Sequence, residues 1–187
     1  MILSILIPTL LNRESMLKSL LNDIYNQAYA LDNVNDIEVI IDDRDNSIST
    51  GEKRNDLISR AMGKYIWFID DDDAILPYSI KEVMNGCLKN VDVITFNGFM
   101  TTDGRNREDF VIRLGEQYEK RNGVYYRFPN HICPIKKSLI SNIKFPNIFF
   151  GEDYAWAKII NDERILKTEH IINKDIYHYK FINNKNV

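Results

Sequence analysis

The sequence predicts an α/β fold, with a central, mostly parallel sheet between two layers of helices. Short apolar runs alternate with segments of helical periodicity through residues 1–100. The apolar runs are continuous, which is typical of strands that are covered on both faces. Strands that are joined through helices usually run parallel with right-handed crossovers, so this β-α-β-α-β-α-β order indicates a three-layer α/β/α domain.

The first strand and helix are predicted within residues 3–24. The run Leu3–Thr9 is apolar and contains Pro8 near its end, as expected of a central strand that stops there. Asn12 is a suitable cap for the following helix. The apolar residues of this helix recur at helical spacing and predict its buried face: Met16, Leu17, Leu20, Leu21 and Ile24.

A second strand and helix follow. The apolar run at residues 37–41 predicts a second buried strand. Ser49 and Glu52 have the spacing of a capping box, which predicts the start of a helix, and Gly63 predicts its end.

The third strand, predicted at residues 65–69, leads into a third helix and a fourth strand. Pro77 suits the first turn of that helix. The fourth strand is predicted within residues 91–99. The buried face of the helix is predicted from five apolar residues: Ile80, Val83, Met84, Cys87 and Leu88.

The second half of the chain predicts a smaller, late β region. Asp103-Gly104 is a hairpin signal between two strand-like runs. The polar residues 115–123 predict a mobile loop, and a helix is expected to begin near Asp153. Two late strands are predicted at residues 165–172 and 176–181.

The bulk composition narrows the functional classes. With 187 residues, 27% of them charged and 44% hydrophobic, the chain fits one globular domain. A net charge of -3 gives no general attraction to nucleic acid or acidic membranes. Cys87 and Cys133 lack CxxC spacing, which favours free thiols in a reducing compartment. No segment has transmembrane length and the N-terminus lacks a basic leader, so we expect a cytoplasmic protein.

Acidic residues follow the second and third strands. Asp42-Asp43 and the run Asp70–Asp73 are expected at one edge of the sheet, where open α/β sheets bind their ligands. Carboxylates there suit Mg²⁺ or Mn²⁺, which leave positions for phosphate oxygens and water; a solvated acidic turn is the alternative. Lys53 and Arg54 lie near a helix start and either bind a diphosphate or are solvated.

Four stretches follow one another in an order that is typical of one enzyme family: "SILIPTLLNRESMLKSLLNDIYNQ", "EVIIDDRDNS", "GEKRNDLISRAMGKYIWFIDDDDAILP" and "FFGEDYAWAKII". Together they resemble the metal-dependent GT-A glycosyltransferases of family 2, over nearly the whole chain. The resemblance implies a single GT-A domain at residues 1–187, in which residues 1–100 bind a nucleotide-sugar and residues 101–187 bind the acceptor.

The resemblance implies a donor site at the first two strand ends. Asp43, with Asp42 beside it, would contact the base, and a carboxylate that accepts the uracil N3–H favours a UDP-sugar. Thr9 and the Pro8 backbone would line the same pocket. Lys53 and Arg54 would bind the diphosphate, and Asp70 and Asp71 would complete the site. The expected donor-binding residues are therefore Pro8, Thr9, Asp42, Asp43, Lys53, Arg54, Asp70 and Asp71.

The resemblance also implies a metal site for Mn²⁺ or Mg²⁺. Asp70 and Asp72 match the two acids of the DXD motif, and Asp72 is the expected direct ligand. Asp71 and Asp73 would support the loop or share the metal. His178 lies where family members often place a histidine that reaches the metal or the diphosphate, and a structural strand residue is the alternative.

The catalytic residues implied by the resemblance lie near residue 150. Asp153 matches the general base, which takes the proton of an acceptor hydroxyl as that oxygen attacks the anomeric carbon. Such a single in-line displacement inverts the anomeric centre. Glu152 either acts as the base or orients the loop. His131 would face the acceptor or serve the structure, and Trp156 would stack on an acceptor ring or pack its helix onto the sheet.

The expected acceptor is a hydroxyl of a saccharide, a lipid-linked sugar or a hydroxymethylated DNA base, so nucleic acid enters only as an acceptor. Two features depart from the family pattern: "PTLLN" is one residue longer than usual after Thr9, and Arg44 stands where a small residue is common. The alternatives are a haloacid dehalogenase-like phosphotransferase, a nucleotidyltransferase and a non-catalytic nucleotide- or metal-binding module. The first normally has a small residue and Thr or Val after its second acid, and "DDDDAIL" lacks them.

Overall fold

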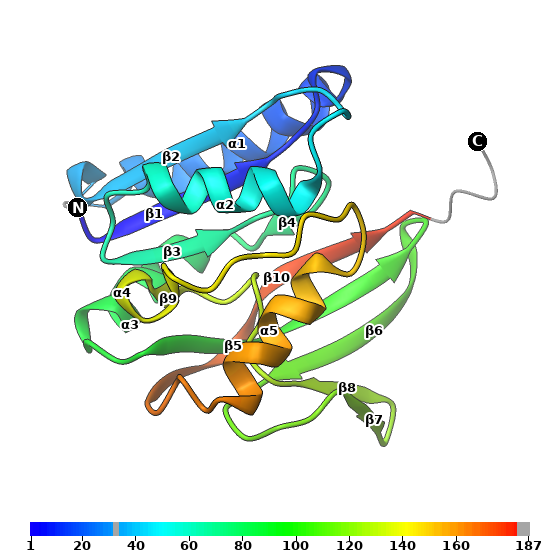
Figure 1. The fold of residues 1–187 in the computed structure, drawn as a ribbon. Coiled ribbons are helices and arrows are strands. Elements are labelled where there is room, and N and C mark those ends of the chain that lie inside the picture. Colours follow the sequence, from blue (N-terminus) through cyan, green and yellow to red (C-terminus); the bar gives the residue numbers. More distant parts are fainter. Residues whose placement is uncertain (32–33, 183–187) are drawn as a thin grey trace.

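The computed structural model describes residues 1–31 and 34–182. These residues form a mixed ten-stranded sheet, in which the order β2-β1-β3-β9-β5-β6-β8-β7 is completed by β10 against β5 and β4. Helices α1 and α3 cover one face of the sheet, and α2 and α5 cover the other (Figure 1). The predicted three-layer α/β/α arrangement is therefore confirmed.

Three parallel strands position the residues of the site that come from the first half of the chain. β1 (Leu3–Pro8) lies between β2 (Ile37–Asp42) and β3 (Tyr65–Phe68), and both pairs are parallel. All of β1 and β3 is buried, as predicted. The prediction that residues 37–41 are buried is wrong, because β2 is an edge strand and these residues are only half-buried.

The first helix begins later than the sequence predicted. A 3₁₀ turn, η1 (Leu11–Arg13), precedes α1 (Glu14–Tyr29) and contains Asn12, so Asn12 is not the cap. Met16 is exposed, and the prediction that it faces the core is wrong. The fully buried residues of α1 follow a narrower stripe than predicted: Leu20, Ile24 and Ala28.

The second helix, α2 (Thr50–Arg60), has the predicted cap. The Ser49 hydroxyl accepts a hydrogen bond from the backbone N–H of Glu52 at 3.1 Å. The helix ends before Gly63, whose role is different from the predicted one. A Cβ added at Gly63 would lie 2.5 Å from the backbone nitrogen of Ser4. Gly63 is therefore required by the close approach of its loop to β1.

Gly63→Ala is accordingly expected to destabilise the fold by about 1–3 kcal/mol, because the added methyl group meets backbone that has no room to move. Urea unfolding followed by circular dichroism measures the difference. Ser59→Ala on the exposed part of α2 is the control and is expected to change the stability by less than about 0.5 kcal/mol. Equal stability of the two variants would refute the steric role of Gly63.

The third helix follows a short strand that the sequence did not predict, β4 (Ala74–Ile75). α3 (Ser79–Leu88) begins two residues after Pro77. Four of its five predicted core residues are buried, but Leu88 is exposed because it lies at the last position of the helix. Strand β5 (Val93–Thr102) follows as predicted.

The second half of the chain is built on hairpins. Asp103-Gly104 is the turn between β5 and β6 (Arg105–Ile112), and both of its residues have positive φ, as predicted for this sequence. The predicted loop at residues 115–123 instead contains β7 (Glu119–Arg121), which pairs with β8 (Val124–Arg127). Its Asn-Gly turn carries the same positive-φ signal and could have been recognised.

The remaining elements complete the sheet. The unpredicted strand β9 (Ile135–Lys136) lies antiparallel between β3 and β5 and runs into α4 (Lys137–Ile140). The two predicted late strands are one long strand, β10 (Glu169–Phe181), because two irregularities in register bend it without ending it. Among the described residues no helix is long and apolar enough to cross a bilayer. The division into residues 1–100 and 101–187 and the cytoplasmic location stay predictions.

Candidate active site

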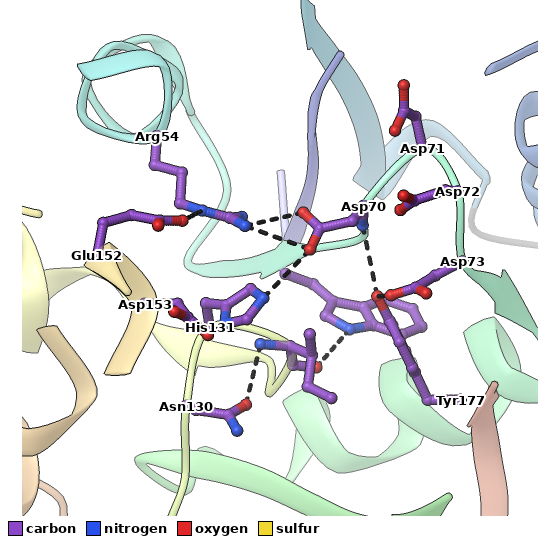
Figure 2. Close-up of polar contacts among 12 residues, drawn as sticks. Arg54, Asp70, Asp71, Asp72, Asp73, Asn130, His131, Glu152, Asp153 and Tyr177 are labelled. Carbon is purple, nitrogen blue, oxygen red and sulfur yellow. Dashed lines mark hydrogen bonds and ion pairs between the residues drawn. The ribbon is translucent and has the colours of Figure 1, made fainter. Parts of the chain in front are cut away.

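The candidate site lies at the carboxyl ends of β1, β2 and β3, as predicted. Pro8 and Asp42 are register partners at the ends of two of these strands, and Asp70–Asp73 follow the third. Helix α5 (Glu152–Asp162) begins at the same edge, after Gly151 with a φ of 80°. Figure 2 shows how these segments bring the acidic loop, Arg54, His131 and the start of α5 together.

Arg54 is the buried centre of this arrangement, with 4% of its side chain exposed. Its Nη2 donates to an Asp70 carboxylate oxygen at 2.9 Å and its Nε donates to Glu152 at 3.1 Å (Figure 2). The guanidinium also lies 5.1 Å from the ring centre of Phe68. Arg54 is thus a buried clamp between two acids and not a solvated residue, and its contact with a diphosphate stays a prediction.

The clamp controls the charge of Asp70. Burial by itself would raise the pKa of Asp70, but the positive charge of Arg54 and the contact with His131 outweigh burial and lower this pKa far below its usual range. Asp70 therefore stays ionised. Glu152 faces Arg54 and is buried, so it fits the loop-orienting role and not that of a base.

His131 connects the two ends of the site. Its Nε2 lies 3.4 Å from Asp70 Oδ2, and its Nδ1 lies 3.5 Å from Asp153 Oδ2. The side chain is 10% exposed, whereas that of Asp153 is 37% exposed. The structure therefore brings the predicted base close to the acidic loop, with one histidine between them (Figure 2).

Asp71 stabilises the loop after β1. Its carboxylate accepts hydrogen bonds from the Thr9 hydroxyl at 2.5 Å and from Arg13 at 2.7 Å, and it is buried. Thr9 and Asp71 were both predicted to bind the donor, but their side chains bind each other. Arg13 was not predicted to take part, although its position directly after "PTLLN" offered a signal.

Asp72 and Asp73 point into different surroundings. Asp72 keeps 28% of its side chain exposed and has Arg13 at 3.4 Å. Burial and the neighbouring Asp70 raise the pKa of Asp72. Asp73 is buried and accepts hydrogen bonds from the Tyr177 hydroxyl at 2.7 Å and from the Lys180 backbone N–H at 2.8 Å. Asp73 therefore supports the loop, one of the two roles that the resemblance implied.

The acids after β2 have separate roles. Asp42 is buried and ion-paired with Arg44, whose Nε lies 2.9 Å from Asp42 Oδ1. Asp43 is exposed. Lys53 is buried and donates to the backbone carbonyls of Thr9, at 2.7 Å, and of Arg44. The ammonium group of Lys53 therefore holds two loops together, and its contact with a diphosphate stays a prediction.

Two further residues take the structural alternatives that the sequence left open. The Nε2 of His178 lies 2.9 Å from the Thr101 hydroxyl, and its ring stacks on Phe99 with centroids 4.3 Å apart, so its contact with a metal stays a prediction. Successive residues of a strand face opposite sides, and Tyr177 is the one that faces the acidic loop. Trp156 is buried, stacks on Phe145 and donates to a backbone carbonyl, so it packs its helix and does not contact an acceptor.

The sequence is similar to those of known glycosyltransferases. Residues 46–157 match the model of the family described as glycosyl transferase family 2. A similar protein is the Campylobacter jejuni GalNAc(5)-diNAcBac-PP-undecaprenol beta-1,3-glucosyltransferase, which is 22% identical over an alignment 193 residues long that covers 86% of this chain and 60% of that protein.

Solved structures of S. aureus TarS share the fold. The TarS 1-349 complex with UDP superposes with a TM-score of 0.69 at 18% identity, over 96% of this chain and 60% of that chain. The complex with UDP-GlcNAc gives a TM-score of 0.67 at 17% identity, over 96% and 58%. The chain thus spans about three fifths of the length of these relatives.

The sheet and its flanking helices have the GT-A fold, which the TarS structures share. Within this fold class, the chain belongs to glycosyl transferase family 2. Because the chain belongs to this family, we no longer consider the alternatives of a haloacid dehalogenase-like phosphotransferase and a nucleotidyltransferase.

Proposed function

We propose that this chain is an inverting, metal-dependent glycosyltransferase, which transfers a sugar from a UDP-sugar to a hydroxyl group of a saccharide acceptor. The observation that carries the proposal is the connection between the two ends of the site. His131 lies within 3.5 Å of Asp153 and within 3.4 Å of Asp70. A carboxylate that can take up the acceptor proton is thereby held beside the acidic loop that would serve the leaving group.

Asp153 is the proposed base. Its carboxylate is partly exposed at the start of α5, where an acceptor hydroxyl has access to it. It would take the hydroxyl proton while the oxygen attacks the anomeric carbon from the side opposite the diphosphate. Glu152 cannot take this role without breaking its ion pair with Arg54. We therefore assign Glu152 to positioning.

Asp43 is the proposed contact for the nucleotide base. It follows β2 at the binding edge of the sheet, and its carboxylate is exposed, whereas that of Asp42 is held by Arg44. A carboxylate accepts a hydrogen bond from the N3–H of uracil, which supports a UDP-sugar donor. The complexes of TarS with UDP and UDP-GlcNAc support the same donor class.

The proposed acceptor is a saccharide, either free or lipid-linked. The name of the Campylobacter relative gives an undecaprenol-linked saccharide as the acceptor of that protein. This relative favours a saccharide over the third class expected from the sequence, a hydroxymethylated DNA base. The net charge of -3 also opposes DNA binding.

Asp72, together with Asp70, would hold Mn²⁺ or Mg²⁺. No group of three or more His, Cys, Asp or Glu side chains forms a complete metal cage within the described residues. The loop still fits such an ion, because Mg²⁺ is commonly held by one or two carboxylates together with substrate phosphates. Asp72 is partly exposed, and nearby carboxylates leave its surroundings negative. A bound divalent cation would neutralise the charge of the departing diphosphate.

A nucleotide screen tests the donor and the metal together. UDP with Mn²⁺ is expected to raise the melting temperature more than GDP, TDP or CMP does, because ligand binding to the folded state stabilises it. Asp72→Ala is expected to weaken the metal-dependent part of UDP binding at least about tenfold, since a coordinating carboxylate is lost. Asp109→Ala, which removes an exposed carboxylate on β6, is the control. If no nucleotide stabilises the wild-type protein, the proposed function is wrong.

A further inference from the structure

We infer that the acceptor site is a groove along α5, which begins at Asp153, passes Tyr118 and Tyr154, and takes a saccharide of more than one ring. The inference rests on the proposed function, since it identifies the substrate class for the same base. It is carried by three observations: a half-exposed aromatic cluster, its fixed position beside the base, and a polar cavity farther along the helix.

The aromatic cluster consists of Tyr118, Phe128 and Tyr154. The ring of Tyr118 lies with its centroid 4.5 Å from that of Phe128 and 5.3 Å from that of Tyr154. Phe128 is buried, whereas Tyr118 and Tyr154 remain 38% and 45% exposed. The two tyrosines therefore present parts of their rings to solvent on a rigid base of packed aromatic side chains.

The cluster is fixed in position relative to the base. Tyr154 directly follows Asp153 on α5. The hydroxyl of Tyr118 accepts a hydrogen bond from the Asn130 amide at 2.8 Å. The next residue after Asn130 is His131, whose Nδ1 lies 3.5 Å from Asp153. The same short segment thus orients both a tyrosine ring and the proposed base.

A cavity of about 710 Å³ lies at the other end of α5. Asn161 lines it and is seven residues after Tyr154, so both lie on the same face of the helix. Gln117 and Pro129, the chain neighbours of Tyr118 and Phe128, line its other side. At a rise of 1.5 Å per residue, the helix advances about 12 Å from Asp153 to Asn161. An acceptor that reached from Asp153 to this cavity would therefore be longer than one sugar ring.

The chemistry of the groove favours a saccharide. A pyranose ring has C–H faces, which pack on aromatic rings, and hydroxyl groups, which need hydrogen-bond partners. The tyrosines supply the first kind of contact. The cavity supplies the second, through Gln117, Asn161, Asp162 and Arg164. Apolar side chains such as Leu114, Ile160 and Leu166 also line the cavity, which suits the C–H faces of a sugar, whereas a lipid tail would require an apolar lining without these polar interruptions.

The test measures binding of defined glycosides in the presence of UDP and Mg²⁺, by saturation-transfer NMR. The probes are the methyl glycosides of glucose, galactose, N-acetylglucosamine and N-acetylgalactosamine, with cellobiose, lactose and chitobiose as disaccharides. We expect at least one disaccharide to bind more tightly than its methyl monosaccharides. Tyr154→Ala should weaken binding at least tenfold. Asn161→Ala should weaken only the disaccharide.

Tyr29→Ala is the matched control, because Tyr29 is also an exposed helical tyrosine and stacks on Tyr25 with centroids 6.0 Å apart. It should leave glycoside binding unchanged. Equal binding by Tyr154→Ala and Tyr29→Ala, or no glycoside binding by a wild-type protein that binds UDP, overturns the groove and leaves the proposed function standing. Failure of the wild-type protein to bind UDP overturns the proposed function and the groove together.

Discussion

Asp153→Asn is expected to bind UDP as tightly as the wild-type protein and to lose transfer by a factor of about 10² to 10⁴, the range that is typical of a lost general base. Asparagine has the shape of aspartate, but it cannot take up the acceptor proton. The substituted side chain is partly exposed and lies 3.5 Å from His131, so the fold should accept the change. Loss of activity with an unchanged melting temperature would locate the defect in the chemical step.

Hydrolysis of a UDP-sugar, with water in place of the acceptor, supplies a readout before the natural acceptor is known. Glu152→Gln is the informative control. It weakens the ion pair with Arg54 and is expected to lower the melting temperature more than Asp153→Asn does, while it retains more hydrolysis. Wild-type hydrolysis rates in Asp153→Asn would remove Asp153 from the mechanism.

Arg54→Met is expected to destabilise the fold by about 3–5 kcal/mol, as is typical when one partner of a buried ion pair is removed. The variant removes the guanidinium that joins the carboxylates of Asp70 and Glu152, so that of the contacts described here only the one from His131 to Asp70 remains. Urea unfolding at pH 7 measures the loss. Arg107→Met is the matched control: Arg107 also contacts an aromatic ring and a carboxylate, but it is half-exposed, so its loss should cost less than about 1 kcal/mol.

The same clamp predicts a pH dependence with a definite sign. The pKa of Asp70 is lower in the folded than in the unfolded protein, so the folded state is stabilised by its ionised form. This contribution is complete above the ordinary aspartate pKa of about 3.9 and declines as the pH falls below it. The stability gap between the wild-type protein and Arg54→Met should therefore narrow below pH 4. A gap that does not change with pH would contradict the electrostatic role of the clamp.

Local signals in the sequence were sufficient for much of the fold. The Ser49 cap and the Asp103-Gly104 turn depend on residues that are close in the chain, and both were predicted correctly. The acidic loop could be placed because it directly follows a buried strand. β9 could not be predicted, since two residues carry no periodic pattern and are ordered only by pairing with β3 and β5.

The site was less predictable, because its contacts join distant segments. Arg54 and Glu152 are 98 residues apart in the chain, and the sequence around either residue does not indicate that they form an ion pair. The sequence pointed to His178, whereas Tyr177 is the residue that contacts the acidic loop, and the irregular register of β10 just before Tyr177 is not visible in the sequence. Trp156 has a position near the base that suggested a substrate contact, and only its packing on Phe145 excluded it.

The long strand β10 has a consequence for how the protein acquires its site. Tyr177 and the backbone N–H of Lys180 hydrogen-bond to Asp73 and so hold the acidic loop in place. Both residues lie more than a hundred positions after Asp73 in the chain, so they are synthesised long after the loop. A nascent polypeptide can therefore carry every proposed catalytic acid and still lack an ordered loop until this segment leaves the ribosome. Premature termination before Glu169 would yield a product with the proposed acids present but without two of the anchors that hold them.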